Sequence, residues 1–449
     1  MTNTVHPLIL NELSRIEHAS IPSPYHTWSC LLHVDGKNYR MPMVLQVSVK
    51  RDYLENLSDV FKVAVKCDAS LYNTVIYPNR DKLKVTLSRR PNYIKGSGDS
   101  FDPLYQVEQY IAKLVDAKSN NMVGENPFTN SKSGENQHSL IDFEMQVTSS
   151  VIARLRNMTY FTNHVNTSAM EAIRTILTRF TVEGGDRDGE RVRGVDVADN
   201  YSTVKRDQIS IPSSTPILDV PAMIDRYSDS VYPTGFGYYL QNGLWYLFSP
   251  YDLKRYERGQ YTRSLTIINV ASFQFPGIEK TYRTTSSQII IVANGETRQF
   301  DPTERNAMNE GTGSRFVDAN RSDENLDSYE GGKMQFKPNE YVNEFTALER
   351  EEGANRMSAS RQITGNPRHE YGKLAQRNGS FLGVIWDLSA PDLLYPGMPV
   401  KYVYVENGLP KSVYGVLEGV DSKDAPANSN PSSTIFSTTS YLNIFLERT

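Results

Sequence analysis

The stretch Met41-Pro42-Met43-Val44-Leu45-Gln46-Val47-Ser48-Val49 decides the fold class of the chain. Its odd positions are apolar, and the positions between them include the polar residues Gln46 and Ser48, with Lys50 next in the series. A period of two puts successive side chains on opposite faces, so the stretch predicts a β-strand with one buried face. Phe61–Cys67 and Leu83–Leu87 repeat the alternation. With a strand over 27–33 and a turn at Asp35-Gly36, they predict a run of antiparallel strands that closes as a barrel or sandwich.

A helix is expected to follow these strands. Asp102 is a favourable N-cap, Pro103 fits the first helical turn, and apolar residues at helical spacing come after it. A further strand is expected over 140–147. The first domain, residues 1–154, is therefore predicted to be a small β-barrel with a helix over 102–116 packed against it.

The middle of the chain, residues 155–375, has the pattern of an α+β domain. Ser168 and Glu171 form a capping box ahead of apolar residues at helical spacing, and Asp219 is expected to cap a second, short helix. An aromatic hairpin is expected around Asn242-Gly243. Further strands are expected in two more apolar runs, 265–270 and 288–293.

A polar insertion is predicted inside this middle domain. Only 8 of the 39 residues of Gly295–Lys333 are apolar, about half the density of the whole chain. Such a segment buries little surface, so it is expected to be a long loop that orders against a partner. Two more loops, rich in small polar residues, are expected over 119–137 and 421–433. Glu183–Asp199, charged and glycine-bearing, is expected to be a turn or loop.

The C-terminal segment, residues 376–449, returns to β patterning and predicts a second β-barrel, which can take strands from earlier in the chain. Pro396-Gly397 and Asn407-Gly408 are the turn signals. The strands are expected over 381–387, 399–405, 411–420 and 440–446. The fold class is therefore α+β and β-rich, with two small antiparallel barrels that bracket an α+β middle region.

Composition excludes several classes of protein. With 48 Lys and Arg against 52 Asp and Glu, the net charge is −4, which gives no whole-molecule signal for nucleic-acid binding. Cys30 and Cys67 cannot make a disulfide framework and are expected in the core. The N-terminus lacks the pattern of a signal peptide, and the longest aliphatic run, Ile289–Ala293, is too short to cross a membrane. We expect a soluble, non-secreted protein without a membrane partner.

The motifs of catalysis and of metal binding are not found. The sequence contains no phosphate-binding loop, and Gly235-Phe236-Gly237 fits a hairpin turn better than a dinucleotide site. No two histidines have the i, i+4 spacing of a zinc helix. The acidic runs 186–190 and 318–327 lack the ligand spacing of a calcium loop. No catalytic, cofactor-binding or metal-binding residue is assigned, and no cofactor is expected.

Two interpretations of charged residues stay open. Arg154, Arg156, Lys205 and Arg206 could contact an anion or could form a solvated face. A pair of the many carboxylates could serve a glycoside hydrolase, because their separation depends on the fold. The abundance of tyrosine, 27 residues, fits either β-strands or surfaces that are buried by partners.

The C-terminal pattern resembles the second barrel of bacteriophage tail and baseplate hubs. The pattern consists of Tyr395–Val400 with its Pro-Gly turn, the Asn-Gly hairpin, Tyr414–Val420, and the apolar final strand Ser440–Leu446. The helix at Asp219 with the aromatic hairpin is similar to the middle domain of such hubs. The first barrel resembles the tail-tube fold.

This resemblance implies a structural virion protein and no enzyme. A hub of this family is a homotrimer in which each chain contributes two tube-like barrels, so that the ring is pseudo-sixfold. Such a ring joins the hexameric tail tube to a threefold central spike and acts as a symmetry adaptor. The implied partners are the tail tube, central spike, tape measure and baseplate wedge proteins, and DNA passes through the lumen without specific binding. The implied location is the virion tail, assembled in the host cytoplasm.

Two other functions stay open from the sequence. One is a peripheral baseplate or other virion scaffold component that binds partners without forming a ring. The other is a carbohydrate- or peptidoglycan-cleaving enzyme on a β scaffold, which needs two carboxylates about 5–9.5 Å apart in a groove.

Overall fold

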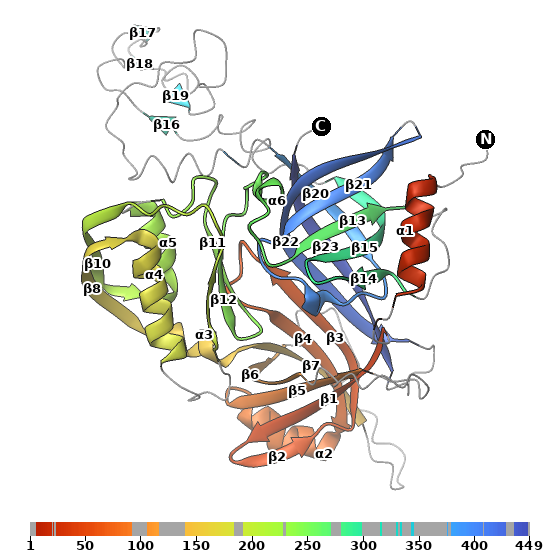
Figure 1. Cartoon of the computed structure of the whole chain (residues 1–449). Coiled ribbons are helices and arrows are strands. Elements are labelled where there is room, and N and C mark those ends of the chain that lie inside the picture. Colours follow the sequence, from red (N-terminus) through yellow and green to blue (C-terminus); the bar gives the residue numbers. More distant parts are fainter. Residues whose placement is uncertain are drawn as a thin grey trace.

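The computed structural model is built mainly of β-strands, with a few short helices (Figure 1). The residues that it describes are 6–19, 21, 24–91, 106–115, 140–183, 192–227, 230–270, 280–298, 375, 379–406, 408–427 and 435–447, and four two-residue strands between 315 and 344. The strands outnumber the helices, and most strand pairs are antiparallel. The predicted β-rich α+β class is therefore confirmed. Within the described ranges, no helix has the length and apolar character that crossing a bilayer requires.

The helices are short. They are α1 (Pro7–Glu17), α2 (Ala69–Leu71), α3 (Ser150–Leu155), α4 (Ala169–Leu177), α5 (Val220–Tyr227) and α6 (Arg255–Arg258). Two of them continue as π-helical turns, α2 over Tyr72–Ile76 and α4 over Thr178–Val182. The capping box that Ser168 and Glu171 predict is present at the start of α4.

The strands of the first half of the chain are β1 (Tyr25–Val34), β2 (Lys37–Arg40), β3 (Met43–Asp52), β4 (Val60–Asp68), β5 (Leu83–Pro91), β6 (Gln106–Leu114), β7 (Leu140–Ser149), β8 (Thr159–Ser168), β9 (Gly194–Val197) and β10 (Lys205–Pro216). Those of the second half are β11 (Gly237–Gln241), β12 (Leu244–Phe248), β13 (Ser264–Asn269), β14 (Tyr282–Thr284), β15 (Gln288–Arg298), β16 (Arg315–Phe316), β17 (Tyr329–Glu330), β18 (Lys333–Met334), β19 (Asn343–Glu344), β20 (Gly379–Trp386), β21 (Pro399–Glu406), β22 (Leu409–Pro426) and β23 (Phe436–Glu447).

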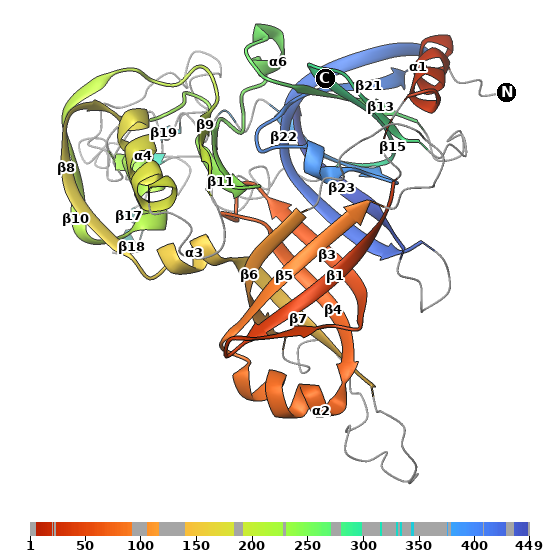
Figure 2. The same cartoon turned by 60° about the horizontal axis from the view of Figure 1, so that its bottom comes forward.

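Most strands belong to one large mixed sheet whose hydrogen-bonded path closes on itself twice. One path runs β22-β3-β4-β7-β6-β5-β1-β23, and it is closed because β22 and β23 also pair. We call it the N-terminal circuit. The other runs β13-β21-β22-β23-β20-β15 and is closed by the parallel pair β13–β15. We call it the C-terminal circuit. Figure 2 shows the orange strands of the first below the blue and green strands of the second.

The two circuits share β22 and β23, which are long enough to serve both. The first half of β22 pairs with β21, and its second half, from Gly419 to Asp424, pairs with β3. The segment 421–426 is therefore strand, where the sequence predicts a loop over 421–433. Ser, Asn and Pro favour loops locally, but a strand with partners on both sides satisfies its backbone groups and outweighs that preference. The strands β13 and β15, which precede residue 300, do join those of the C-terminal segment.

The predicted helix over 102–116 is wrong where the structure describes it, because residues Gln106–Leu114 form β6. The strand lies between β5 and β7 and pairs with both. Tyr110 and Ala112 alternate into the core of the N-terminal circuit. The apolar residues at 107, 111 and 114 have the spacing of a helix, but as a strand the segment pairs with β5 and β7 on both edges and buries Tyr110 and Ala112.

The middle of the chain holds a ribbon and a small sheet. The ribbon is the antiparallel pair β8–β10, which lies over α4 and α5 (Figure 1). The small sheet is β11-β12-β9, and its β11–β12 hairpin turns at Asn242-Gly243 as predicted, both residues having positive φ. Two expectations are corrected here. Part of the predicted loop 183–199 is the strand β9, and Asp219 ends a 3-10 turn instead of capping α5.

The N-terminal helix α1 packs against the outer face of the C-terminal circuit. Its buried residues Ile9, Leu13 and Ile16 follow the spacing of one helix face and contact strand residues of β13 and β15. No helix is predicted over these residues from the sequence. The domain limits at 154 and 375 remain a prediction. The insertion 295–333 and the loop 119–137 fall almost wholly outside the described residues.

Candidate functional site

A network of buried and half-buried charges lies inside the N-terminal circuit, at the end where the other parts of the chain meet it. Arg51 of β3 and Arg89 of β5 are its cations. The Nη2 group of Arg51 donates to Asp392 Oδ1 at 2.8 Å, and Nη1 of Arg89 donates to the other oxygen of the same carboxylate. Asp392 comes from the 3-10 turn Pro391–Leu393, which follows β20. One carboxylate thus links two strands of one circuit to a turn of the other.

A second acid ties Arg51 to the middle of the chain. Arg51 Nε donates to Asp59 Oδ2 at 3.0 Å, and the hydroxyl of Tyr239 on β11 donates to Asp59 Oδ1 at 3.0 Å. Beside them, the side chain of Gln241 donates to the carbonyl of Leu394 at 2.9 Å. The N-terminal circuit, the small sheet and the turn after β20 are therefore joined by hydrogen bonds that start from Arg51 and Gln241.

The third acid of the network is Asp424 on β22. Trp28 Nε1 donates to its Oδ2 at 2.7 Å, and the hydroxyl of Thr438 donates to Oδ1 at 2.6 Å. His26 Nε2 lies 3.3 Å from the same carboxylate. Arg89 also donates to Thr438 Oγ1 at 3.0 Å. The shared strands β22 and β23 are thereby fastened to β1 and β5 by side chains as well as by the sheet.

The electrostatics of the three acids follow from burial and from the arginines. Burial alone would raise the pKa of Asp392, but the guanidinium groups of Arg89 and Arg51 outweigh it and hold that pKa below its ordinary value. The pKa of Asp424 is lowered in the same way, because the interactions with His26 and Arg89 outweigh the effect of burial. The pKa of Asp59 is raised, because burial outweighs the single arginine beside it. The three acids are therefore members of an ion cluster and not free carboxyl groups.

The cavity beside this network is small. It is lined by Trp28, Arg51, Asp59, Arg89 and Asp392, among others, and its volume is about 20 Å³. That is about the room one water molecule needs. A glycoside hydrolase needs a groove that admits a sugar ring between two carboxylates. These acids are engaged by arginines and lie against a cavity of one water, so this cluster does not fit that chemistry.

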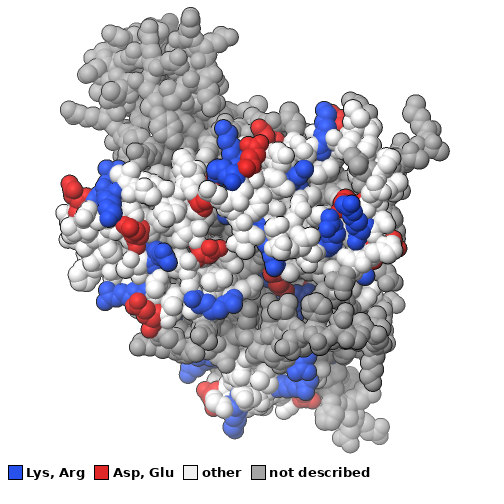
Figure 3. Space-filling view, viewed as in Figure 1, with Lys and Arg blue, Asp and Glu red and all other residues white. Residues whose placement is uncertain are grey.

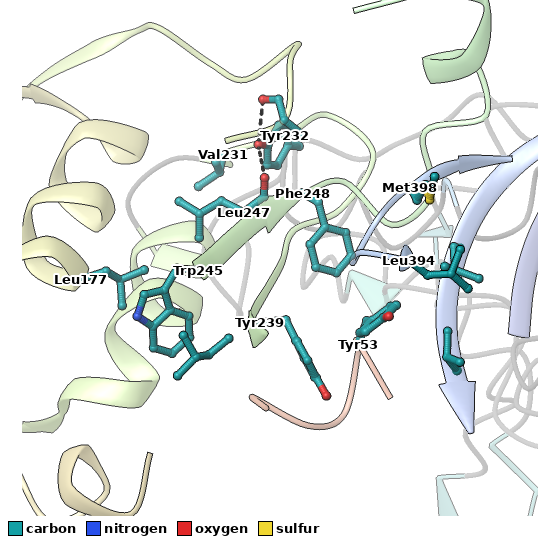
Figure 4. Close-up of a cluster of buried hydrophobic side chains, with 14 of the residues drawn as sticks. Tyr53, Leu177, Val231, Tyr232, Tyr239, Trp245, Leu247, Phe248, Leu394 and Met398 are labelled. Carbon is teal, nitrogen blue, oxygen red and sulfur yellow. Dashed lines mark hydrogen bonds between the residues drawn. The ribbon is translucent and has the colours of Figure 1, made fainter. Parts of the chain in front are cut away.

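Apolar packing extends this ion network (Figure 4). We call the network and the packed side chains around it, which connect the N-terminal circuit, the small sheet and the C-terminal circuit, the joint. The rings of Tyr53 and Tyr239 meet edge to face with centroids 4.9 Å apart. In the same view Phe248 of β12 points toward Leu394 and Met398, which belong to the C-terminal part of the chain. One continuous core thus runs from α4 through the small sheet to the C-terminal circuit. The arrangement can hold the parts of the chain in one fixed orientation.

A second ion cluster braces the Pro396-Gly397 turn. Arg258 of α6 pairs with both Asp199 and Asp252, its Nε lying 2.8 Å from Asp199 Oδ2. Arg255, buried on the same helix, donates to the carbonyl of Gly397. The turn that carries the C-terminal sequence pattern is therefore held by a helix from the middle of the chain.

Gly397 allows us to test that brace. Its φ is +68°, and an added Cβ would lie 2.6 Å from Cβ of Phe248. We expect Gly397→Ala to lower the free energy of unfolding by about 2–4 kcal/mol, from backbone strain plus the steric clash. Gly36→Ala is the matched control, because its φ is +76° and nothing lies within 4 Å of the added Cβ. Urea titration of both measures the difference, and equal losses would show that the contact with Phe248 costs nothing.

Glu418 is the least favourable group in the joint. It is 4% exposed, neither carboxylate oxygen has a hydrogen-bond partner among the described residues, and it sits at a bulge of β22 between Leu417 and Gly419. Burial, with a smaller contribution from Asp52, raises its pKa well above the ordinary value. Burial therefore favours the protonated form of this carboxyl group in the folded chain.

The structure bears on several of the chemical interpretations of the sequence. Cys30 and Cys67 are buried, and neither forms a disulfide. Burial raises the pKa of Cys30 to about 12 and that of Cys67 to about 11, so neither thiol is a nucleophile at neutral pH. The described residues hold no cluster of ligands fit for a metal ion. The acidic runs 186–190 and 318–327 lie outside the described residues, so their interpretation as solvated loops stays a prediction.

The four basic residues do not form one anion site. Arg154 precedes β8 and donates to the carbonyl of Phe180 at 3.1 Å. Lys205 and Arg206 pair with the far end of β8, at Ser168 and Thr167. A strand of this length separates its ends by about 30 Å. The solvated-face interpretation therefore holds for Lys205 and Arg206, both of which are exposed.

Comparison with known proteins gives structural neighbours only. No protein-family model matches the chain, and no curated protein sequence matches it significantly. Among solved structures, the chain is similar to the 43 kDa tail protein of prophage MuSo2 from Shewanella oneidensis, with a TM-score of 0.43 and 10% identity over 93% of this chain and 96% of that one.

Two further structures are similar over most of this chain. One is an E. coli protein described as a component of the type VI secretion system with structural similarity to the T4 bacteriophage tail proteins gp27 and gp5; its TM-score is 0.41 and its identity 11%, over 93% of this chain and 77% of that one. The other is a Francisella PdpA–VgrG complex, with a TM-score of 0.35 and 9% identity over 98% of this chain and 61% of that one. A tail protein of a prophage is thus among the structures to which the chain is similar.

Proposed function

We propose that the chain is a structural component of a phage-type tail, and specifically a central hub of which three copies form a pseudo-sixfold ring. The observation that carries the proposal is the pair of closed strand circuits joined through β22 and β23. If each circuit acts as one tube-like barrel, three chains supply six barrels around one axis. One face of such a ring matches a hexameric tube, and the other keeps threefold symmetry for a central spike.

The buried joint supports this function. A symmetry adaptor works only when the two barrels of a chain keep a fixed mutual orientation, since an error in the angle would keep the ring from closing. The network around Arg51 and Asp392 and the core of Figure 4 provide that rigidity. Neither feature needs a substrate or a cofactor.

The charge distribution fits a channel through which DNA passes without specific binding. The chain has a net charge of −4, and the face in Figure 3 carries both signs in small, mixed groups. A strongly basic wall would bind phosphates and retain the DNA. The partners that follow from the proposal are two further copies of the chain and the tail tube, central spike, tape measure and baseplate wedge proteins, in a virion tail that is assembled in the host cytoplasm.

The molar mass of the purified chain tests the ring. Light scattering across a concentration series is expected to give a stable species of three times 50.8 kDa. Three copies are expected because two barrels per chain need three chains to match a hexameric tube. A chain that stays monomeric at every concentration, alone and with a hexameric tube protein, would contradict the proposal.

A further inference from the structure

Leu388, in the turn that follows β20, has a backbone conformation that its residue type disfavours. Its φ is +47°, in the left-handed region where Cβ crowds the following carbonyl oxygen. Of the other five non-glycine residues with positive φ in the described ranges, four are asparagine or aspartate, which tolerate this region better. A leucine held in this conformation indicates that the surrounding structure imposes it.

The turn is a β-bulge between β20 and β23. The two strands pair as far as Trp386, which faces Ser440. The chain bonds to β23 again at Ser389, whose N–H donates to the carbonyl of Thr438 at 2.9 Å. Two residues thus lie opposite one, and the register moves by one residue. Because side chains alternate along a strand, such a shift reverses the face to which each following side chain points.

Side-chain hydrogen bonds hold the bulge from both sides. The hydroxyl of Thr281 donates to the carbonyl of Asp387 at 2.8 Å and accepts from Trp386 Nε1 at 3.0 Å. On the other side, the hydroxyl of Ser389 lies 2.7 Å from that of Ser440. These contacts fit one arrangement of the bulge, so they can offset the unfavourable backbone conformation between them.

We propose that the left-handed backbone of Leu388 positions Asp392 in the joint. Asp392 follows it by four residues, and its carboxylate accepts from Arg51 and Arg89 of the N-terminal circuit. Without the extra residue of the bulge, the turn that carries this carboxylate would start from the opposite face of the strand. Leu388 is thus a positioning residue that acts through Asp392. Its consequence for the ring, a fixed angle between the two circuits, rests on the proposed function.

Two substitutions separate the backbone of Leu388 from its side chain. Leu388→Ile keeps the volume but adds a branch at Cβ, which makes a positive φ less favourable. Leu388→Asn removes the apolar side chain and keeps the tolerance of the left-handed region. Leu31→Ile, at a half-buried position in the extended backbone of β1, is the matched control. We expect Leu388→Ile to lower the equilibrium constant of folding about tenfold, and Leu31→Ile to leave it nearly unchanged.

The pKa of Asp392 is the readout that a role in packing alone would not move. It is measured by NMR of the full chain, isotope-labelled at the aspartate carboxyl carbons, and its signal is identified by comparison with Asp392→Asn. In the parent chain Arg89 and Arg51 hold this pKa below its ordinary value, against the effect of burial. In Leu388→Ile the carboxylate moves away from both guanidinium groups, so its pKa is expected to rise. In Leu388→Asn and Leu31→Ile it is expected to stay low.

Either of two results would overturn the positioning role. One is an Asp392 pKa that stays low in a folded Leu388→Ile variant. The other is a pKa that rises in Leu388→Asn, which would assign the effect to the apolar side chain; this result does not need the isoleucine variant to fold. Neither measurement needs a trimer. A parent chain that stays monomeric would therefore overturn the proposed function and leave this inference standing.

Discussion

Arg51→Met is expected to lower the free energy of unfolding by about 3–5 kcal/mol, because it breaks a buried ion network by removing one partner. Arg51 is 4% exposed and binds Asp59 and Asp392. Methionine fills a similar volume but leaves both carboxylates short of a donor, and Asp59 loses its only arginine in the network. Urea titration at neutral pH measures the loss.

Lys50→Met is the control on the same strand. Lys50 neighbours Arg51, its side chain is 54% exposed, and its ion pair with Asp52 is 3.5 Å long. An exposed pair contributes little, so this change is expected to cost less than about 0.5 kcal/mol. A double-mutant cycle with Asp392→Asn then isolates the coupling of Arg51 to that carboxylate. Equal losses of unfolding free energy from Arg51→Met and Lys50→Met would show that the ion network around Arg51 does not stabilise the fold.

Glu418→Gln is expected to stabilise the protein at neutral pH and to have no such effect near pH 4. The pKa of Glu418 in the folded chain lies above its value in the unfolded chain, because burial disfavours the charged form. The folded state therefore binds a proton that the unfolded state releases as the pH rises. Between the two pKa values the parent chain loses about 1.4 kcal/mol per pH unit, and glutamine, which does not titrate, loses none.

Thermal or urea unfolding of both proteins from pH 4 to pH 8 measures this difference. The gap between variant and parent should widen as the pH rises from about 4.5 and stop widening above the folded pKa. Glu55→Gln, at an exposed position in the turn after β3, is the matched control and should give a gap that stays flat. A flat gap for Glu418→Gln as well would mean that its carboxylate is ionised and solvated in the folded chain.

The two arginines of the joint can be read from the alternation in the sequence. Val47 and Val49 point into the N-terminal circuit, and the same period of two carries on to Arg51. Leu83, Val85 and Leu87 lead to Arg89 in the same way, although it is only partly buried. Each apolar face ends in an arginine at the same end of the circuit. A charged residue at the next inward position of an apolar strand is therefore a signal for a buried ion site.

The acids that meet these arginines could not be found in that way. Asp392 follows Arg51 by 341 residues and lies in a short turn without periodicity. Asp59 precedes β4 in an irregular stretch, so no pattern shows which way its side chain points. Both depend on how the C-terminal turn and the small sheet pack against the first circuit. Local patterns do not contain that information.

Local patterns also explain the errors in the fold. Strands with clean alternation, such as β4 and β5, and the hairpin at Asn242-Gly243 are predicted correctly because short-range chemistry determines them. The segment of β6 fits a helix by spacing, and the end of β22 fits a loop by composition. Each becomes a strand because free strand edges lie on both sides. The sharing of β22 and β23 by two circuits is a property of the whole sheet.

End-on electron micrographs of the purified assembly would show whether three chains form a pseudo-sixfold ring. We expect a closed ring of threefold symmetry with six lobes of density around a central channel, two from each chain. The six lobes should alternate between two kinds, because the N-terminal and C-terminal circuits differ in strand number. Single chains, twofold dimers, or a threefold particle with three lobes would show that the chain does not form this ring.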